Sequence, residues 1–139
     1  MDGSTTDQAM TEFIRDTMPL CDTLRVRCTH HEPDSTTLEL DWAPELCTAA
    51  GILHGGVVMA LADSAGGACA FANLPAGAAG TSTIESKTNF LGAVRDGAVS
   101  ATARPLHVGG STIVVETEVR NGDRLIAKTT QTQTILRAR

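Results

Sequence analysis

The chain has 139 residues, 42% of them hydrophobic and 19% charged, with a net charge of −5. This length suits one domain with a single core, and the composition excludes a chain that is mainly disordered. The negative charge, without a basic patch or aromatic residues interleaved with Lys and Arg, argues against a nucleic-acid-binding protein.

The N-terminal part of the chain is typical of a polar tail followed by a short helix. Residues 1–8 have no apolar stretch, so we expect a frayed tail and no signal peptide. Residues 9–18 predict an amphipathic helix that ends at Pro19. We therefore assign residues 1–18 as tail and helix, and residues 19–139 as one domain. The apolar residues of the predicted helix recur at helical spacing: Met10, Phe13, Ile14 and Met18.

Two segments of alternating polarity come next. LRVRCTH (24–30) and TTLELDW (36–42) predict half-buried strands joined by a turn, and residues 43–52 predict a loop. The cysteines, which lack a CxxC spacing, indicate reduced thiols and a cytoplasmic protein. They are Cys21, Cys28, Cys47 and Cys69.

The stretch LHGGVVMALADSAGGACAFANL (53–74) is apolar except for one carboxylate. Asp63 is the only charged residue between Gly55 and Ile84. The segment predicts a helix from about Gly55 to Asn73 that is apolar nearly all round, as buried helices are. Its Ala and Gly content and its central carboxylate favour a buried helix over a membrane span. Because an unpaired carboxylate in a core is costly, Asp63 must be paired, face a cleft or take part in chemistry.

Period-two polarity predicts four strands after the helix, at 81–91, 98–106, 112–120 and 124–136. The short turns between them imply an antiparallel sheet. One helix can be apolar all round beside such a sheet if the sheet curls about it, which is an α+β architecture. The few aromatic residues make a small core, so we expect the exposed sheet edges to pair with a second subunit.

Three motifs in this order resemble the hotdog-fold thioesterases of the PaaI type, which include phenylacetyl-CoA and hydroxybenzoyl-CoA thioesterases. They are HGG followed by Asp at the spacing HGG-x6-D (54–63), TNFLGAVRDG (88–97) and HVGGSTIVVETEVRNGDRLIAKTTQT (107–132). The resemblance implies one long buried helix wrapped by a five- to six-stranded antiparallel sheet. It also implies a homodimer that pairs into a tetramer, with two active sites at each dimer interface. The implied function is hydrolysis of an aromatic or medium-chain acyl-CoA, without a metal or a cofactor other than the substrate's own coenzyme A.

The resemblance gives five residues roles in catalysis. The N–H of Gly55, at the open N-terminus of the long helix, binds the oxyanion. Asp63, which we expect to be partly buried, acts on the other subunit's thioester as general base or as nucleophile through a mixed anhydride. His54 either contacts the substrate or fixes the turn. Thr48 replaces the Asn or Gln with which many relatives hold the attacking water, and Thr83 is placed to hydrogen-bond the water or the carboxylate.

For coenzyme A, the resemblance points to the helix start, the next strand and the following hairpin. Many relatives have basic residues where this chain has Gly92-Ala93 and Gly110-Ser111, so Arg95, Arg104 and Arg137 are candidate replacements. The matching positions are Gly56, Asn89, Phe90, Leu91, Gly92, Arg95, Val108, Gly109, Gly110 and Ser111.

The loss of these basic residues leaves two alternatives open. One is a non-catalytic protein of the same fold that binds acyl-CoA or another small ligand. The other is a thioesterase that acts on acyl carrier protein. In either case the acyl group is expected to lie among small helix residues and a methionine: Met59, Ala60, Ala62, Gly66 and Gly67.

Overall fold

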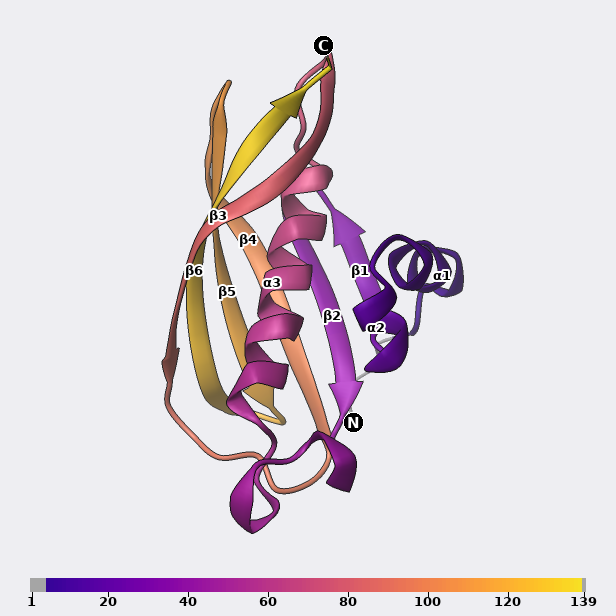
Figure 1. The fold of residues 1–139 in the computed structure, drawn as a ribbon, viewed down its shortest axis with the longest axis vertical. Coiled ribbons are helices and arrows are strands. Elements are labelled where there is room, and N and C mark those ends of the chain that lie inside the picture. The colour runs from indigo at the N-terminus through magenta and orange to yellow at the C-terminus, as the bar shows by residue number, and fades with distance from the viewer. Residues whose placement is uncertain (1–4, 139) are drawn as a thin grey trace.

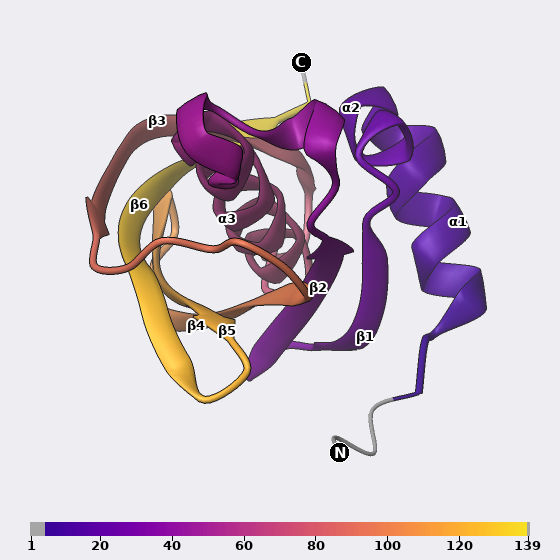
Figure 2. The same ribbon diagram turned by 90° about the horizontal axis from the view of Figure 1, so that it is seen from below.

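A six-stranded antiparallel sheet curls around one central helix in the computed structural model, which describes residues 5–138 (Figures 1 and 2). The strand order is β1-β2-β4-β5-β6-β3. The expected α+β architecture is therefore confirmed, with six strands. The helices are α1 (Gln8–Thr17), α2 (Pro19–Thr23) and α3 (Gly55–Phe71), and two short 3-10 turns lie at Pro44–Leu46 and Ala49–Gly51. The strands are β1 (Arg27–Glu32), β2 (Ser35–Asp41), β3 (Ala78–Phe90), β4 (Ala98–Val108), β5 (Thr112–Asn121) and β6 (Arg124–Arg137).

The central helix α3 is buried where it faces the sheet and exposed along one stripe. Leu61, Ala62 and Ala65 are fully buried, and these mostly small side chains let the sheet approach closely. The exposed residues of this stripe are Gly56, Met59, Asp63 and Phe71, and the half-buried Gly67 lies on it between the last two. Within a single chain, the sheet therefore covers only one side of this otherwise apolar helix. No helix within residues 5–138 has the length and hydropathy needed to cross a membrane.

The N-terminal segment forms two helices. The predicted frayed tail lies outside the described residues at positions 1–4, while Asp7 caps α1 by accepting a hydrogen bond from the Met10 N–H at 3.0 Å. The prediction that a strand begins at Leu24 is wrong. Pro19 starts the helix α2, because its fixed φ suits the first helical position, and Arg25 then turns the chain at a positive φ of 56°.

The two edges of the sheet differ. Helix α1 covers the β1 edge: the Asp7 N–H donates to the Cys28 carbonyl at 2.7 Å, and the Cys28 N–H donates to the Thr11 hydroxyl at 2.9 Å. The 13-residue strand β3 forms the other edge, and no described strand pairs with its outer side. Ile84 and Phe90 are more than half exposed on this strand. Such a long free edge favours pairing with another chain.

Three of the four free cysteines belong to the core. Burial raises the pKa of Cys28 and of Cys69 to about 11, and it also raises the pKa of Cys21. Because these pKa values lie above neutral pH, the thiols stay protonated and act as small apolar side chains.

Candidate active site

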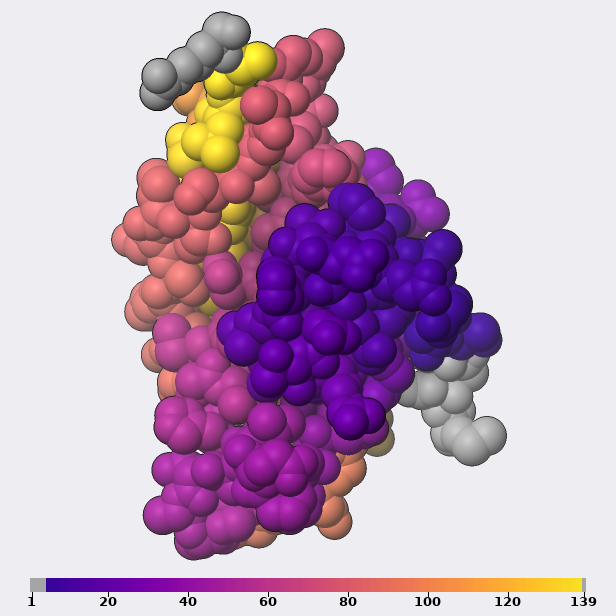
Figure 3. Space-filling model, turned by 45° about the vertical axis from the view of Figure 1, so that its right-hand side comes forward, coloured from indigo at the N-terminus to yellow at the C-terminus, as the bar shows by residue number. Residues whose placement is uncertain are grey.

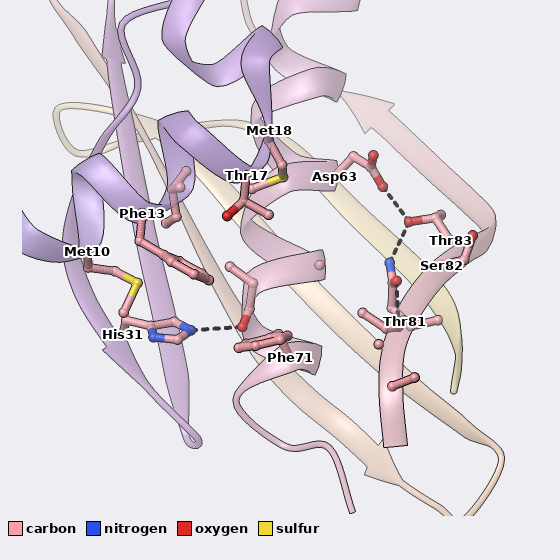
Figure 4. A pocket seen from close by; sticks show the side chains of 16 residues that line it. Met10, Phe13, Thr17, Met18, His31, Asp63, Phe71, Thr81, Ser82 and Thr83 are labelled. Carbon is pink, nitrogen blue, oxygen red and sulfur yellow. Dashed lines mark hydrogen bonds between the residues drawn. The ribbon is translucent and has the colours of Figure 1, made fainter. Parts of the chain in front are cut away.

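Asp63 lies on the exposed stripe of α3, and one of its two carboxylate oxygens is held by donors from the sheet. Its Oδ1 accepts a hydrogen bond from Thr83 Oγ1 at 2.7 Å (Figure 4). The same oxygen accepts another from Gln131 Nε2 at 3.0 Å. No described residue donates to Oδ2. The expected partial burial of Asp63 is wrong for the single chain, in which this residue is exposed because the sheet covers the opposite side of α3. The carboxylate is thus fixed in orientation with one oxygen open.

A polar row on β6 supports this carboxylate from behind. Gln131 and Gln133 are almost completely buried, and Gln133 Nε2 donates to Thr83 Oγ1. Because a Gln amide nitrogen can only donate, Thr83 must direct its own proton to Asp63. Thr81 in turn donates to Gln133 Oε1 at 3.0 Å. The sequence analysis expected the hydrogen bond from Thr83 to the carboxylate. The bond from Gln133 fixes the direction in which the Thr83 hydroxyl donates its proton.

The sequence analysis did not identify the two glutamines. In the run TTQTQTIL they alternate with threonines, so every position looks suited to the solvent face of a strand. The available signal was the spacing of Gln131 and Gln133 from Ile135, since residues two and four apart share one face. All three side chains are buried on the face toward α3.

Gly66 and Gly67 should respond oppositely to alanine, because only Gly66 faces Gln131. A Cβ at Gly66 would overlap the Gln131 amide, whereas a Cβ at Gly67 would meet nothing within 4 Å. Alanine improves helix propensity by up to about 1 kcal/mol at either position, so this gain cancels in the comparison. We expect Gly66→Ala to be less stable than Gly67→Ala by about 1–3 kcal/mol in urea unfolding. Equal midpoints would show that Gln131 is not held in this position.

The N-terminus of α3 presents one backbone N–H without a partner. The Gly56 N–H donates to His54 Nδ1 at 2.8 Å, and the N–H groups of Val57 and Val58 both donate to the His54 carbonyl. Within residues 5–138, no acceptor contacts the Gly55 N–H. The N-terminal end of a helix carries partial positive charge, so this free group is suited to bind a developing oxyanion. Gly56 was predicted to bind substrate, and its N–H is already bonded to His54.

The same contact defines what His54 does in the structure. Its Nδ1 accepts a hydrogen bond, so in the neutral ring the proton lies on Nε2. His54 is the N-cap of α3, and this bond fixes the turn that presents Gly55. Its ring is exposed, which leaves Nε2 accessible to a substrate.

A cavity of about 340 Å³ adjoins Gly55. Thr48, Phe90 and Gly92, all predicted site residues, contribute to its wall. The Phe90 ring packs so closely that a Cβ on Gly55 would lie 3.2 Å from its Cζ. Thr48 precedes the second 3-10 turn, is exposed and caps no N–H there. The structure thus places these three residues beside the free N–H and not beside Asp63.

The other predicted coenzyme A residues fall into two groups at opposite ends of the sheet. Asn89, Leu91 and Arg95 are exposed at the end where α3 begins, and Asn89 Oδ1 accepts a hydrogen bond from Lys87 at 3.0 Å. The hairpin at 108–111 lies at the other end. Its Gly110 carbonyl accepts a hydrogen bond from Arg137 at 2.7 Å.

Strand register measures how far apart these groups are. Phe90 pairs with Ala127, whereas Thr112, which follows the hairpin, pairs with Thr134. These partners are seven residues apart on β6, or about 23 Å at the usual rise per residue. Ser82 also pairs with Thr134, so the hairpin lies at the Asp63 end of β3. Of the candidate replacement cations, Arg104 is on β4 beside Ser100 and Thr102, on the face away from α3.

Gly55 and Asp63 are also separated within one chain. Asp63 follows Gly55 by eight residues of helix, which is about 12 Å along the axis. The free N–H and the open carboxylate oxygen therefore cannot act on the same carbonyl group inside one subunit. The structure has two separate half-sites, one around Gly55 and one around Asp63.

A second cavity, of about 400 Å³, opens beside Asp63. Its walls come from α1, α3 and β3, and Figure 3 shows the surface hollowed between the N-terminal helices and β3. Of the residues proposed to surround an acyl group, Gly67 lines this cavity. Ala62 is buried in the core, and Met59 lies exposed on the stripe of α3.

Comparison with known proteins identifies relatives along most of the chain. The family model described as "Thioesterase superfamily" matches residues 50–128, which include Gly55, Asp63 and Thr83. The Mycobacterium tuberculosis protein named "Putative esterase Rv1847" is 32% identical over 115 residues, covering 81% of this chain and 82% of that protein. The solved structure of that esterase has a TM-score of 0.84 at 29% identity, covering 88% of this chain and 99% of the other.

Two further solved structures share the fold. A thioesterase family protein from Silicibacter pomeroyi has a TM-score of 0.84 at 28% identity, covering 92% of this chain and 96% of the other. A mutant thioesterase, PA1618 from Pseudomonas aeruginosa, has a TM-score of 0.86 and covers 98% of both chains. At 22% identity, this last likeness concerns the fold alone.

Proposed function

This chain belongs to the thioesterase superfamily, and on that premise we propose that it hydrolyses acyl-CoA esters to a free acid and coenzyme A. Family membership supports thioester hydrolysis as the general reaction. The observation that carries the proposal for this chain is the Asp63 carboxylate, which Thr83 and Gln131 hold through Oδ1 while Oδ2 remains open. A carboxylate fixed in this way is suited to attack a carbonyl group or to activate water.

We propose a homodimer because the two half-sites of one chain are too far apart to cooperate. The free edge of β3 supports this arrangement. In an antiparallel pair related by a two-fold axis near Ser86, the Phe90 end of one β3 would lie opposite the Thr83 end of the other. Phe90 packs on Gly55 and Thr83 binds Asp63, so each half-site would meet its complement.

In this dimer, the thioester carbonyl oxygen points at the Gly55 N–H of one subunit. Asp63 of the partner subunit then either removes a proton from an attacking water or attacks the carbonyl carbon itself. Both routes expel coenzyme A as its thiolate, and in the second route water hydrolyses the resulting mixed anhydride. The same pairing brings the segment 89–95 of one subunit toward the hairpin 108–111 of the other, which supports a shared coenzyme A site with Arg95 as its exposed cation.

Thiol release tests this function. The full chain is incubated with acetyl-, hexanoyl-, phenylacetyl- and palmitoyl-CoA, and free thiol is followed with a chromogenic disulfide. We expect turnover with at least one ester, at a kcat within the range of about 1–10³ s⁻¹ typical of enzymes. Tight binding of these esters without thiol release would favour a non-catalytic binding protein. Turnover of acyl carrier protein esters alone would assign the carrier protein as the natural leaving group.

A further inference from the structure

We propose that the cavity between α1, α3 and β3 receives the acyl group, and that it selects uncharged, apolar acyl groups of compact size. This inference rests on the proposed function and names the substrate class of the same site. Asp63 lines the cavity, so an acyl group held there has its carbonyl end beside the carboxylate. The volume of about 400 Å³ lies near the lower end of the range for small-molecule sites, which is about 300–1,000 Å³.

The direction of the acyl group follows from the helix. Gly67 and Phe71 follow Asp63 by one and two turns on the same side of α3, and both line the cavity. The side chain missing at Gly67 leaves open space, because a Cβ there would meet nothing within 4 Å. An acyl chain lying along this stripe would pass over Gly67 and reach Phe71 about 12 Å from Asp63.

Helix α1 supplies the apolar wall at that distance. Phe13 and Phe71 form an aromatic pair with ring centroids 6.1 Å apart. Met10 and Met18 complete this side, and their flexible thioethers adapt to aliphatic or aromatic groups (Figure 4). Phe13 and Phe71 are each about half exposed in the chain, so a ligand would bury apolar surface that is now in contact with water.

The charges around the cavity exclude acidic acyl groups. No lysine or arginine among the described residues lines it, and its one carboxylate is Asp63. His31 Nε2 lies 2.9 Å from the Ala68 carbonyl and Thr83 binds Asp63, while Thr17 and Ser82 add only neutral hydroxyls to the lining. A succinyl or malonyl group would therefore bring a second negative charge beside Asp63 with no lysine or arginine to compensate it.

Filling the cavity from Gly67 tests this assignment. The variant Gly67→Leu adds bulk where space is open, and leucine favours the helix more than glycine does. Two ratios are measured, hexanoyl-CoA over acetyl-CoA and hexanoyl-CoA over succinyl-CoA. The first ratio is taken from kcat/KM in the active protein and from Kd by calorimetry in an Asp63→Asn background, where bound esters persist. The second ratio is taken from kcat/KM alone, because the repulsion of succinyl-CoA requires the Asp63 charge. Ala9→Leu places a leucine at an exposed position of α1 that does not line the cavity.

In wild type we expect both ratios to favour hexanoyl-CoA by about tenfold or more. Gly67→Leu should reduce the hexanoyl-to-acetyl ratio by at least tenfold, and Ala9→Leu should not change it. The assignment is overturned if Gly67→Leu leaves that ratio as in wild type, or if succinyl-CoA is used as well as hexanoyl-CoA. The protein could also release no thiol and still bind hexanoyl-CoA more tightly than acetyl-CoA, with Gly67→Leu abolishing this preference in Kd. That result would support the assignment of the cavity to the acyl group and would contradict the proposed function.

Discussion

Replacing Asp63 with asparagine should lower kcat for thioester hydrolysis by about 10²–10⁴-fold, the range expected when acid–base assistance is lost. The asparagine carbonyl oxygen can still accept the hydrogen bonds from Thr83 and Gln131 that now reach Oδ1. What changes is the open oxygen, which becomes an amide nitrogen with neither charge nor a basic lone pair. The substitution thus removes the reactive part of the side chain and keeps its supports. Thiol release from the best ester in the acyl-CoA series measures the effect.

Two comparisons make this result specific to catalysis. The urea midpoint of Asp63→Asn should match that of wild type, which would show that the hydrogen bonds are kept. Asp123→Asn removes a carboxylate from an exposed turn between β5 and β6 and should keep wild-type kcat. An Asp63→Asn protein that retains kcat within a few-fold of wild type would show that this carboxylate serves binding or structure instead.

Proline at position 55 should abolish most activity by removing a single hydrogen-bond donor. Gly55 is the first residue of α3, a position where proline is well tolerated, and His54 before it has φ −62° and ψ 132°, which suits a residue preceding proline. Its N–H makes no hydrogen bond within the described chain, so the helix loses none. The loss of one oxyanion donor costs about 10²–10³-fold in kcat. We therefore expect the kcat of Gly55→Pro to be lower than that of Gly55→Ala by this factor.

The alanine variant is the matched reference, because it keeps the N–H while adding the same Cβ. That Cβ lies 3.2 Å from Phe90 Cζ in both variants, so the displacement of the ring that the Cβ causes is shared. Circular dichroism and urea unfolding check that both proteins fold alike. If Gly55→Pro and Gly55→Ala have the same kcat, another group binds the oxyanion.

Sequence patterns predicted the elements whose periodicity is unbroken. The apolar run after His54 gave α3 nearly to its last residue, and the alternation in STIVVETEVR gave β5. The pattern misled at 24–26, where alternating polarity continues through the end of α2 and a turn at Arg25. Alternation describes which side chains are buried, and a short helix followed by a turn can bury Leu24 and Val26 as a strand would.

The candidate site could be predicted only in part, because its contacts are long-range. The motif spacing named Asp63 and Gly55, and the resemblance suggested Thr83. The second donor to the carboxylate, Gln131, is 68 residues away, and its position depends on the register between β3 and β6. The separation of the half-sites follows from the rise of α3, which no motif records. The cavity beside α1 depends on how that helix packs over the β1 edge.

The separation of Gly55 and Asp63 along α3 would have a genetic consequence in the proposed dimer. Each catalytic unit would take its oxyanion donor from one polypeptide and its carboxylate from the other. Two alleles, one defective at Gly55 and the other at Asp63, would therefore rebuild one intact unit whenever their products pair, with both defects gathered in the other unit. Alleles defective at the same residue would not complement each other. A mixture of the two variant subunits would then be more active than either variant alone, although every polypeptide in the mixture carries a defect.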